Sequence, residues 1–430
     1  MDRPCDRARH DRRAAPMSSV LRSDAGRLPL ADNTVDLIVT SPPYFGLRSY
    51  TDGGEHYTGQ VGDEDTPTAY LDRLIACTAE WMRVLKPSGN IFVNLGDKYA
   101  SYEGNRGAGR MQDNVSRGVK PTGAGLTGGG FVKAKSLMML PARYAIRCVD
   151  ELGLIQRAEI IWSKPNGLPE SVTDRVRRSH EQVFHFTKEP RYFAGVDEIR
   201  EEIAPAGLAR RAYTYNVGDA QRAGNNPVLN GAGLRPANPL GKLPGSVWTI
   251  PTASLTVPAS LGVDHFAAFP PELVRRIVLG WSPREVCTAC GQGRRPVAVT
   301  QLGIKERHTP VYSEDGVVRH GKGASTLGSR GPSAYITGYA CACPDVSAPV
   351  TPGVCLDPFG GTGTTALVAD CYGRVGISVD LSHDYSRLAR WRTTDPGERA
   401  RVLHVEKPPV QVDGQIDMFG DDPTQGEDEL

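Results

Sequence analysis

A glycine-rich segment in the last fifth of this chain most constrains its fold. Asp357-Pro358-Phe359-Gly360-Gly361-Thr362-Gly363-Thr364-Thr365-Ala366 follows the apolar run Val354–Leu356 and precedes a helical pattern. Glycines at such a junction let the backbone turn tightly and approach a ligand. Asp380 ends the next apolar run, 19 residues after Gly361, where a carboxylate can bind ribose hydroxyls. The segment predicts an α/β sheet with a ligand beside this turn.

Two kinds of ligand fit the turn. Gly361-x-Gly363-x-x-Ala366 matches the dinucleotide fingerprint, which leaves a nicotinamide cofactor open. Asp357 places a carboxylate among backbone amides, and this arrangement suits a cationic group such as the amine of S-adenosylmethionine. A Walker P-loop is excluded because no lysine follows the glycines. A tight turn without a ligand is the structural alternative.

Strand and helix patterns alternate through most of the chain. Strands are expected at 35–40, 90–95, 158–162, 181–186, 354–357 and 375–380, and helices at 70–85, 140–152, 269–279, 364–370 and 385–392. A turn is expected at 86–89. The pattern fails between about 204 and 260 and again from 285 to 345. We predict one α/β domain that two irregular insertions interrupt.

Composition and charge narrow the class of protein. The 430 residues are 39% hydrophobic and 23% charged, and they include no apolar stretch of the ~18–20 residues that a membrane span needs. Nine cysteines are too few for a disulfide scaffold, so we expect a soluble, cytoplasmic protein. Net charge is +5 over residues 104–135, +4 over 204–246 and −7 from 406 onward. The basic segments predict loops that close on a phosphate backbone, with a solvated surface as the alternative.

A proline pair follows the expected strand at 35–40. Thr40-Ser41-Pro42-Pro43-Tyr44 lies where open α/β sheets place their ligands. Prolines have no N–H to donate, so their carbonyls can act as rigid acceptors beside the Ser41 hydroxyl and the Tyr44 ring. These groups predict a site for an amine donor on a planar ring, and a plain strand-ending turn is the alternative.

These motifs together resemble the beta group of DNA amino-methyltransferases, in which the catalytic motif precedes the S-adenosylmethionine motif. The matching segments are TSPPY (40–44), DPFGGTGTT (357–365), HFAAFPPELV (265–274), SDA (23–25), IIWSKPN (160–166) and DLSHDYSRLA (380–389). The resemblance implies an α/β fold with a Rossmann-like methyltransferase sheet of seven strands, a circularly permuted motif order and irregular insertions.

The resemblance also assigns roles to residues. The catalytic set would be Ser41, Pro42, Pro43 and Tyr44, with hydrogen-bond acceptors for an exocyclic amine and a ring that stacks on the base. The cofactor set would be Asp24, Phe266, Asp357, Phe359, Gly361, Gly363 and Asp380. A base inside a duplex cannot reach such a pocket, so base flipping from double-stranded DNA is implied.

The expected activity is methyl transfer from S-adenosylmethionine to cytosine N4, because relatives with serine at the first motif position are more often cytosine enzymes. Adenine N6 is the alternative. A catalytically inactive DNA-binding zinc protein is a more distant one, and a nicotinamide dehydrogenase would leave the proline pair unexplained. A cognate restriction endonuclease and a homodimer are further expected partners.

Two cysteine pairs predict a structural zinc site. Cys287-x-x-Cys290 is typical of a zinc knuckle, and Cys341-x-Cys343 can supply two more ligands. Reduced thiols and disulfides remain alternatives, because the gap between the pairs is longer than in most zinc sites.

The expected organisation follows from these motifs. It is a disordered leader (1–16), a catalytic half (17–200) with a mobile basic loop (104–135), a target recognition insertion (201–260), a cofactor-closing element (261–284), a zinc-binding insertion (285–345), an S-adenosylmethionine-binding half (346–405) and an acidic disordered tail (406–430).

Overall fold

The computed structural model describes residues 17–46, 51–52, 55–56, 59–100, 132–167, 169–203, 238–263, 269–301, 333–345 and 347–407. The expected leader, most of the acidic tail, most of the two basic segments and Phe266 lie outside these residues. No helix in the described ranges is both long and apolar enough to cross a membrane.

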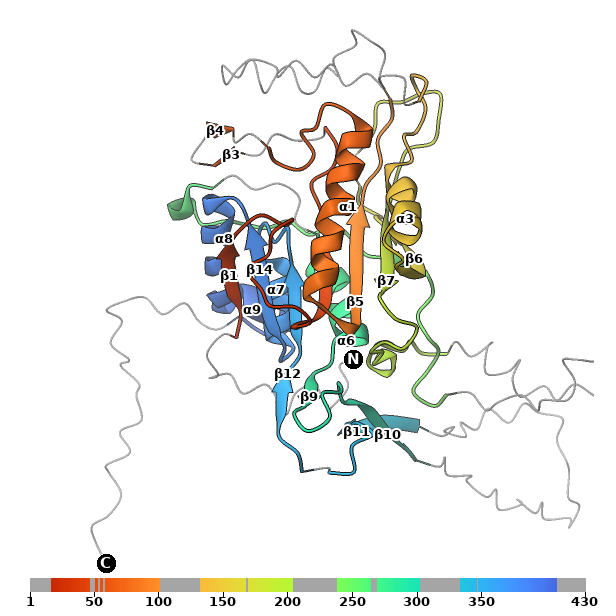
Figure 1. Cartoon of the computed structure of the whole chain (residues 1–430), viewed down its shortest axis with the longest axis vertical. Coiled ribbons are helices and arrows are strands. Elements are labelled where there is room, and N and C mark those ends of the chain that lie inside the picture. The colour runs from red at the N-terminus through yellow and green to blue at the C-terminus, as the bar shows by residue number, and fades with distance from the viewer. Residues whose placement is uncertain are drawn as a thin grey trace, which may run out of the picture.

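One mixed sheet of eight strands organises the molecule, in the order β1-β14-β13-β2-β5-β7-β6-β8 (Figure 1). Its strands are β1 (Ser19–Arg22), β2 (Val35–Thr40), β5 (Leu85–Leu95), β6 (Ile155–Ser163), β7 (His180–Thr187), β8 (Val247–Thr249), β13 (Val354–Asp357) and β14 (Val375–Asp380). The α/β fold class is confirmed. The expected count of seven strands is wrong, because β8 adds a parallel edge strand beside β6. With three residues, β8 is too short to show a periodic pattern.

The direction of the strands decides which residues meet. β7 is antiparallel to both of its neighbours, β5 and β6, whereas the other pairs in the sheet are parallel. The beginning of β7 therefore lies at the same edge of the sheet as the ends of the other strands. β13 pairs with β2 in the middle of the sheet, so segments from opposite parts of the chain become neighbours.

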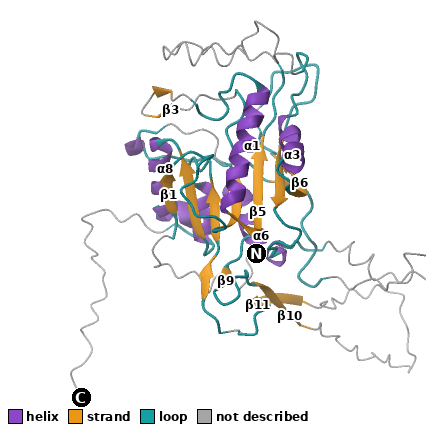
Figure 2. Cartoon of the chain, in the orientation of Figure 1, coloured by secondary structure: helices purple, strands orange, loops and turns teal. Residues whose placement is uncertain are grey.

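Helices cover both faces of the sheet (Figure 2). α1 (Pro67–Val84) and α3 (Leu140–Asp150) pack on one face, and α6 (Pro271–Trp281), α7 (Thr364–Cys371) and α9 (Pro396–Leu403) pack on the other. α8 (His383–Thr394) lies beside β1 and β14. β2 is buried along its whole length, because both of its faces contact helices. Short 3-10 turns occur at Val196–Ile199 and Ala259–Leu261.

The start of β5 differs from the sequence expectation. Residues 86–89, expected as a turn, lie within β5, where the register against β2 shifts between Val35 and Leu37. Val35 pairs with Leu85 and Leu37 pairs with Asn90. The polar residues 86–89 are thus an irregularity inside a strand rather than a separate connection.

Small strand pairs lie outside the main sheet. β9 (Glu285–Cys287) pairs with β12 (Val350–Pro352), β10 (Arg295–Gln301) pairs with β11 (Ser333–Ala340), and β3 (Thr51–Asp52) pairs with β4 (Glu55–His56). Part of the insertion expected to be irregular is therefore a two-stranded ribbon, which lies below the sheet in Figure 1. Its side chains are largely exposed, so it shows little apolar alternation.

Candidate active site

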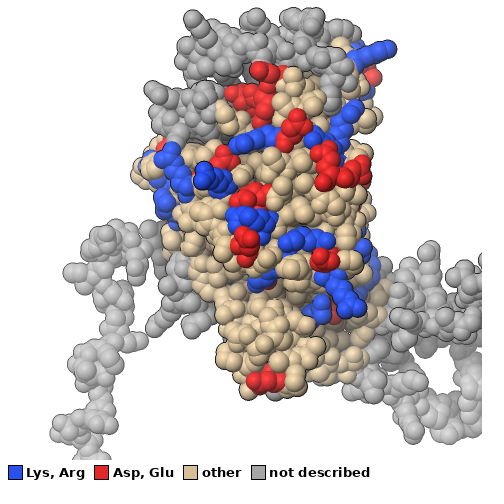
Figure 3. Space-filling view, viewed as in Figure 1, with Lys and Arg blue, Asp and Glu red and all other residues tan. Residues whose placement is uncertain are grey.

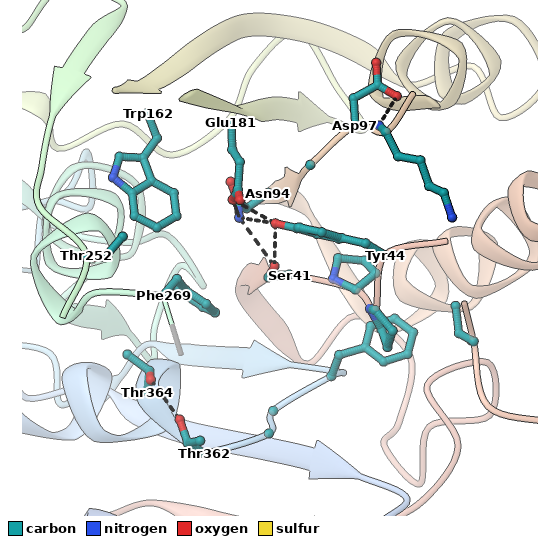
Figure 4. A pocket seen from close by; sticks show the side chains of 18 of the residues that line it. Ser41, Tyr44, Asn94, Asp97, Trp162, Glu181, Thr252, Phe269, Thr362 and Thr364 are labelled. Carbon is teal, nitrogen blue, oxygen red and sulfur yellow. Dashed lines mark hydrogen bonds between the residues drawn. The ribbon is translucent and has the colours of Figure 1, made fainter. Parts of the chain in front are cut away.

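A pocket of about 880 Å³ opens at the edge of the sheet where β2, β5, β6 and β14 end and β7 begins. Both predicted motifs line it: the Ser41–Tyr44 loop after β2 and the turn from Phe359 to Thr362 after β13. Figure 4 shows side chains of the two segments facing a common space, with Trp162 and Phe269 on a further wall. Motifs more than 300 residues apart in the sequence thus form one site.

The Ser-Pro-Pro-Tyr loop is held by hydrogen bonds on both sides of its tyrosine. Tyr44 Oη donates to Glu181 Oε2 at 2.8 Å and lies 3.5 Å from Ser41 Oγ. Tyr70 Oη donates to the Pro43 carbonyl at 2.9 Å. A Cβ added at Gly96 would lie 2.5 Å from Tyr44 Cε2, so a glycine is needed beside the ring. The loop presents its serine and its tyrosine in a defined geometry.

Asn94 and Lys164 complete this polar cluster. Asn94 Nδ2 donates to Glu181 Oε2 at 2.8 Å and to Tyr44 Oη at 3.0 Å. Lys164 Nζ forms an ion pair with Glu181 Oε1 and lies 4.2 Å from the centroid of the Trp162 ring. Burial, followed by the negative charge of Glu181, raises the pKa of Tyr44 well above its usual value. The tyrosine hydroxyl therefore stays protonated and acts as a donor to Glu181.

The glycine-rich turn is held through its backbone. Gly361 N donates to Asp380 Oδ2 at 2.9 Å, and Ser382 N donates to Asp380 Oδ1 at 2.8 Å. A Cβ at Gly361 would have one neighbour within 4 Å, the Phe359 carbonyl oxygen at 3.9 Å, so open space lies beside the turn. An ionised carboxylate offers about four lone-pair sites, so Asp380 can also accept bonds from a ligand hydroxyl.

A buried arginine supports the same turn from the protein interior. Arg392, 2% exposed, donates from Nη1 to Thr362 Oγ1 at 2.8 Å and to Thr364 Oγ1 at 2.6 Å. Its Nε donates to Glu398 Oε2 at 2.9 Å. The ion pair compensates the buried charge of the guanidinium, and the two hydroxyl contacts hold the turn against α8.

Two predicted cofactor residues do not line the pocket. Asp357 is 1% exposed, and its carboxyl accepts Phe359 N at 3.1 Å and Thr365 Oγ1 at 3.0 Å. Burial raises the pKa of Asp357 to about 7. The interpretation of this residue as a partner for a ligand cation needs correction, because the carboxyl faces inward. Gly363 (φ +75°) packs against α8, where a Cβ would lie 2.9 Å from the Ala389 Cβ.

Of the remaining predicted cofactor residues, two line the pocket and one lies outside the described residues. Asp24 and Phe359 line the pocket. Asp24 accepts Gly26 N at 2.6 Å and forms an ion pair with Arg73 at 2.8 Å. The Phe359 ring packs edge-on against Trp81, with ring centroids 6.0 Å apart. Phe266 lies outside the described residues, so its predicted role stays a prediction.

Sequence reasoning missed the acidic residue of the polar cluster. Glu181 is the first residue of the strand expected at 181–186, and in an all-parallel sheet the first residue of a strand lies at the edge opposite the ligand. Because β7 runs antiparallel, its first residues lie at the pocket edge. The IIWSKPN segment had marked Lys164, but only the structure places it against Glu181.

The cysteines of the two pairs lie together beside β9. The sulfur atoms of Cys287, Cys290 and Cys343 are all within 4.8 Å of one another, and the Cys290 and Cys341 sulfurs are 3.7 Å apart. Zn–S bonds of about 2.3 Å in a tetrahedron require S–S separations of roughly 3.8 Å, so the spacing fits a thiolate site. The hydrogen bond from the Cys290 backbone N–H lowers the pKa of Cys287 to about 7. All eight cysteines in the described ranges have free thiols.

An open sheet with these two motifs at one edge defines the class of Rossmann-like methyltransferases. A family model described as DNA methylase, covering N6 and N4 methyltransferases, matches residues 35–287. The chain therefore belongs to the N6/N4 DNA methylase family. This membership replaces the nicotinamide dehydrogenase alternative.

Three comparisons illustrate the similarity. The Type II methyltransferase M.XycI of Xanthomonas campestris pv. cyanopsidis is 43% identical over 203 residues, 46% of this chain and 62% of the relative. The match thus spans less than two thirds of that relative. The Type II methyltransferase M.SmaI of Serratia marcescens is 28% identical over 83% of both chains. The solved PvuII DNA methyltransferase (cytosine-N4-specific) has a TM-score of 0.48 and 17% identity, over 91% of this chain and 96% of that one.

Proposed function

We propose that this protein transfers a methyl group from S-adenosylmethionine to the N4 amine of a cytosine that has been flipped out of double-stranded DNA. One observation carries the proposal: the Ser41–Tyr44 loop and the turn at Phe359–Thr362 line the same pocket. The first segment offers acceptors and a ring for a base, and the second offers backbone groups for a nucleoside beside Asp380 of β14, which can accept a hydrogen bond from a ribose.

The residues of the first segment bind and orient the base. Ser41 Oγ and the Pro42 carbonyl accept hydrogen bonds from the exocyclic amine, and Tyr44 stacks on the ring. The amine lone pair is delocalised into the ring, so the free base is a weak nucleophile. Acceptors on the amine hydrogens favour a tetrahedral nitrogen, whose lone pair is then aligned for in-line attack.

The turn at Phe359–Thr362 and the end of β14 bind the cofactor. Asp380 accepts hydrogen bonds from the ribose, Phe359 and the Gly361 backbone contact the nucleoside, and Asp24 lies near the adenine. Asp357 and Gly363 act indirectly by shaping the turn. When bound, S-adenosylmethionine supplies the electrophilic methyl sulfonium.

The preference for cytosine over adenine rests on the resemblance to the family, in which members with serine at the position of Ser41 are more often cytosine enzymes. A hydroxyl lacks the full negative charge that an aspartate would hold against the amine. The carboxylate of Glu181 contacts Tyr44 and Asn94, and no hydrogen bond between it and Ser41 is seen among the described residues. Adenine N6 is the competing substrate, because both targets are amines on planar rings.

Nucleoside analysis tests the proposal. DNA methylated by the purified protein is digested, and the modified nucleoside is identified by mass spectrometry. N4-methylcytosine is the expected product. Detection of N6-methyladenine instead would show that adenine is the substrate. Recovery of 5-methylcytosine alone, or of no methylated nucleoside, would refute the proposal.

DNA recognition is proposed for the basic segments, with residues 201–260 as the target recognition element. The face seen in Figure 3 carries interspersed lysine, arginine and acidic side chains rather than a continuous basic surface, so it offers little attraction for a phosphate backbone. The Type II designation of the relatives favours a role beside a cognate restriction endonuclease.

We also propose one structural zinc bound by Cys287, Cys290, Cys341 and Cys343. The spacing of the cysteine sulfur atoms supports it. Four thiolates leave no open coordination position, so the metal organises the ribbon of β10 and β11 and takes no part in the chemistry. Elemental analysis of active protein purified without chelator should give about one zinc per chain, and less than about a tenth of an equivalent would remove the site.

A further inference from the structure

The connection between β6 and β7 carries an exposed valine next to the pocket. Val176 is 84% exposed, more than any other large apolar side chain in the described part of the chain. Arg175, Arg177 and Arg178 surround it in the sequence. Single exposed apolar side chains are common on protein surfaces. The location of Val176, between arginines and beside a pocket proposed to bind DNA, is suited to contact with the nucleic acid.

The segment around Val176 is braced. The Arg175 guanidinium lies 3.7 Å from the centroid of the Tyr99 ring, pairs with Glu170 at 2.7 Å and donates to the Val176 carbonyl at 3.0 Å. Arg177 Nη1 donates to the Gly167 carbonyl at 3.1 Å. The valine is thus presented by a defined backbone, and little conformational entropy remains to be lost when it is buried.

The segment around Val176 lies beside the opening of the pocket. Tyr99, which Arg175 covers, lines the pocket, and so do Glu170 and Arg178 on the two sides of Val176. The loop begins and ends at the pocket edge of the sheet, above β6 and β7 (Figure 1). Val176 therefore lies in a loop of which other residues, Glu170 and Arg178, line the pocket.

We propose that Val176 enters the DNA duplex and fills the gap left by the flipped base. This inference rests on the proposed function, because only an extrahelical target leaves such a gap. A flipped base exposes the faces of its two neighbours to water, and an apolar side chain inserted there restores contact with them. The positive charges of Arg177 and Arg178 complement the phosphates on either side, whereas Arg175 is paired with Glu170 and braces the loop.

Single-turnover methylation of two duplexes tests the wedge. One duplex is fully paired, and the other has an abasic site opposite the target, so that the target base is already unpaired. Val176→Ser should slow methylation of the paired duplex about tenfold or more, which corresponds to roughly 1.4 kcal/mol of lost stabilisation, and should leave the second duplex within about threefold of wild type.

The matched control is Val405→Ser, which changes an exposed valine that does not line the pocket. This control should behave as wild type on both duplexes. Equal rates for Val176→Ser and wild type on the paired duplex would overturn the proposal, as would equal slowing on both substrates. A change in oligomeric state of Val176→Ser by light scattering would reassign the side chain to a protein contact. If wild type methylates neither duplex, the proposed function itself fails.

Discussion

The Tyr44 hydroxyl donates a hydrogen bond of 2.8 Å to Glu181, a residue from a strand that runs against its neighbours. Lys164 holds the other oxygen of the same carboxylate. The tyrosine that stacks on the base in the proposed mechanism is therefore oriented by an ion pair beneath it. In Tyr44, therefore, the ring and the hydroxyl have different expected roles: the ring stacks on the base, and the hydroxyl fixes the orientation of the ring.

Tyr44→Phe keeps the ring and removes the hydroxyl. We expect a loss of about tenfold in kcat, because one hydrogen bond to a charged group is removed, whereas Tyr44→Ala should abolish most methyl transfer. Glu181→Gln should lower kcat by a similar factor or more, since Lys164 then lacks its counter-charge. Steady-state kinetics measure these changes.

A double-mutant cycle checks whether the two residues act together. If Glu181 acts through Tyr44, the double variant Tyr44→Phe/Glu181→Gln should lose little more than the stronger single variant. Affinity for S-adenosylmethionine should stay near wild type throughout. Fully additive losses would contradict the link between the residues.

Asp380→Asn should weaken S-adenosylmethionine binding about 10- to 100-fold. The carboxylate accepts the backbone N–H groups of Gly361 and Ser382, and an amide can accept only one of them, so both the turn and the ribose contact are lost. Isothermal titration calorimetry measures the change. Ser41→Ala is the matched control, with affinity retained and methyl transfer lost; similar affinity losses in both variants would argue against this division of roles.

Arg392→Leu should destabilise the fold by roughly 1–3 kcal/mol, because Glu398 keeps only its second ionic partner, Arg401, and the Thr362 and Thr364 hydroxyls lose their donor. The double variant Arg392→Leu/Glu398→Leu should recover much of that stability. Cofactor affinity should remain reduced in the double variant, since Thr362 and Thr364 no longer have their donor. Denaturant unfolding and calorimetry measure the two effects, and recovery of both together would assign Arg392 a purely structural role.

His185 predicts a pH dependence of stability. Its ring is 2% exposed, stacks 4.2 Å from the Phe92 ring and places Nε2 2.9 Å from Asn90 Oδ1. Burial, together with the charge of Arg157, lowers its pKa from 6.5 to about 3. Between these values the unfolded chain binds the extra proton, so stability is complete above pH 6.5 and falls on acidification by up to about 1.4 kcal/mol per pH unit.

The measurement compares wild type with His185→Gln, which has a hydrogen-bond donor and does not titrate. Burial raises the pKa of Asp357 to about 7, and that carboxyl contributes a slope of opposite sign, but its effect cancels in the difference between the two proteins. The free energy of unfolding of wild type should fall more steeply from pH 6.5 to 4.5 than that of the variant. Parallel curves would mean that the pKa of His185 is the same in the native and the unfolded protein, and would contradict the prediction.

If the proposed zinc is bound, Cys287→Ser should release it and make the segment around β9, β10 and β11 more sensitive to proteolysis. DNA binding should weaken, while S-adenosylmethionine binding is largely kept, because the cysteines are not among the residues that line the pocket. Cys77→Ala, which removes a buried thiol of α1, is the control. Identical metal content and protease sensitivity in the two variants would contradict the assignment.

Strongly patterned elements were predictable from the sequence. The helix expected at 70–85 is α1, and its expected core positions Leu71, Leu74 and Trp81 are buried, because apolar residues at helical spacing must face the sheet. The strands at β2, β13 and β14 follow from their apolar β-branched runs. Because parallel strands end at the same edge of a sheet, the sequence also predicted that the loop after β2 and the turn after β13 would line one pocket.

Features that depend on tertiary context were not predictable. The acidic residue of the cluster, Glu181, needed knowledge that β7 is antiparallel, which no local pattern encodes. The inward orientation of Asp357 depends on two tertiary donors, because Thr365 Oγ1 donates to one oxygen of its carboxyl and the Phe359 backbone N–H donates to the other. The ribbon of β10 and β11 lacks a buried face, so its strands have no alternating signal to detect.

The pairing of β2 with β13 joins the middle of the sheet to a strand made late in synthesis. A ribosome that adds ~5–20 residues per second needs roughly 15–60 s to cross the roughly 300 residues between them. During that interval the edge of β2 that later faces β13 lacks its partner, although β2 is buried along its whole length in the finished fold. Unpaired apolar strand edges are where nascent chains associate wrongly. The yield of folded protein should therefore depend on growth temperature and chaperone supply during translation.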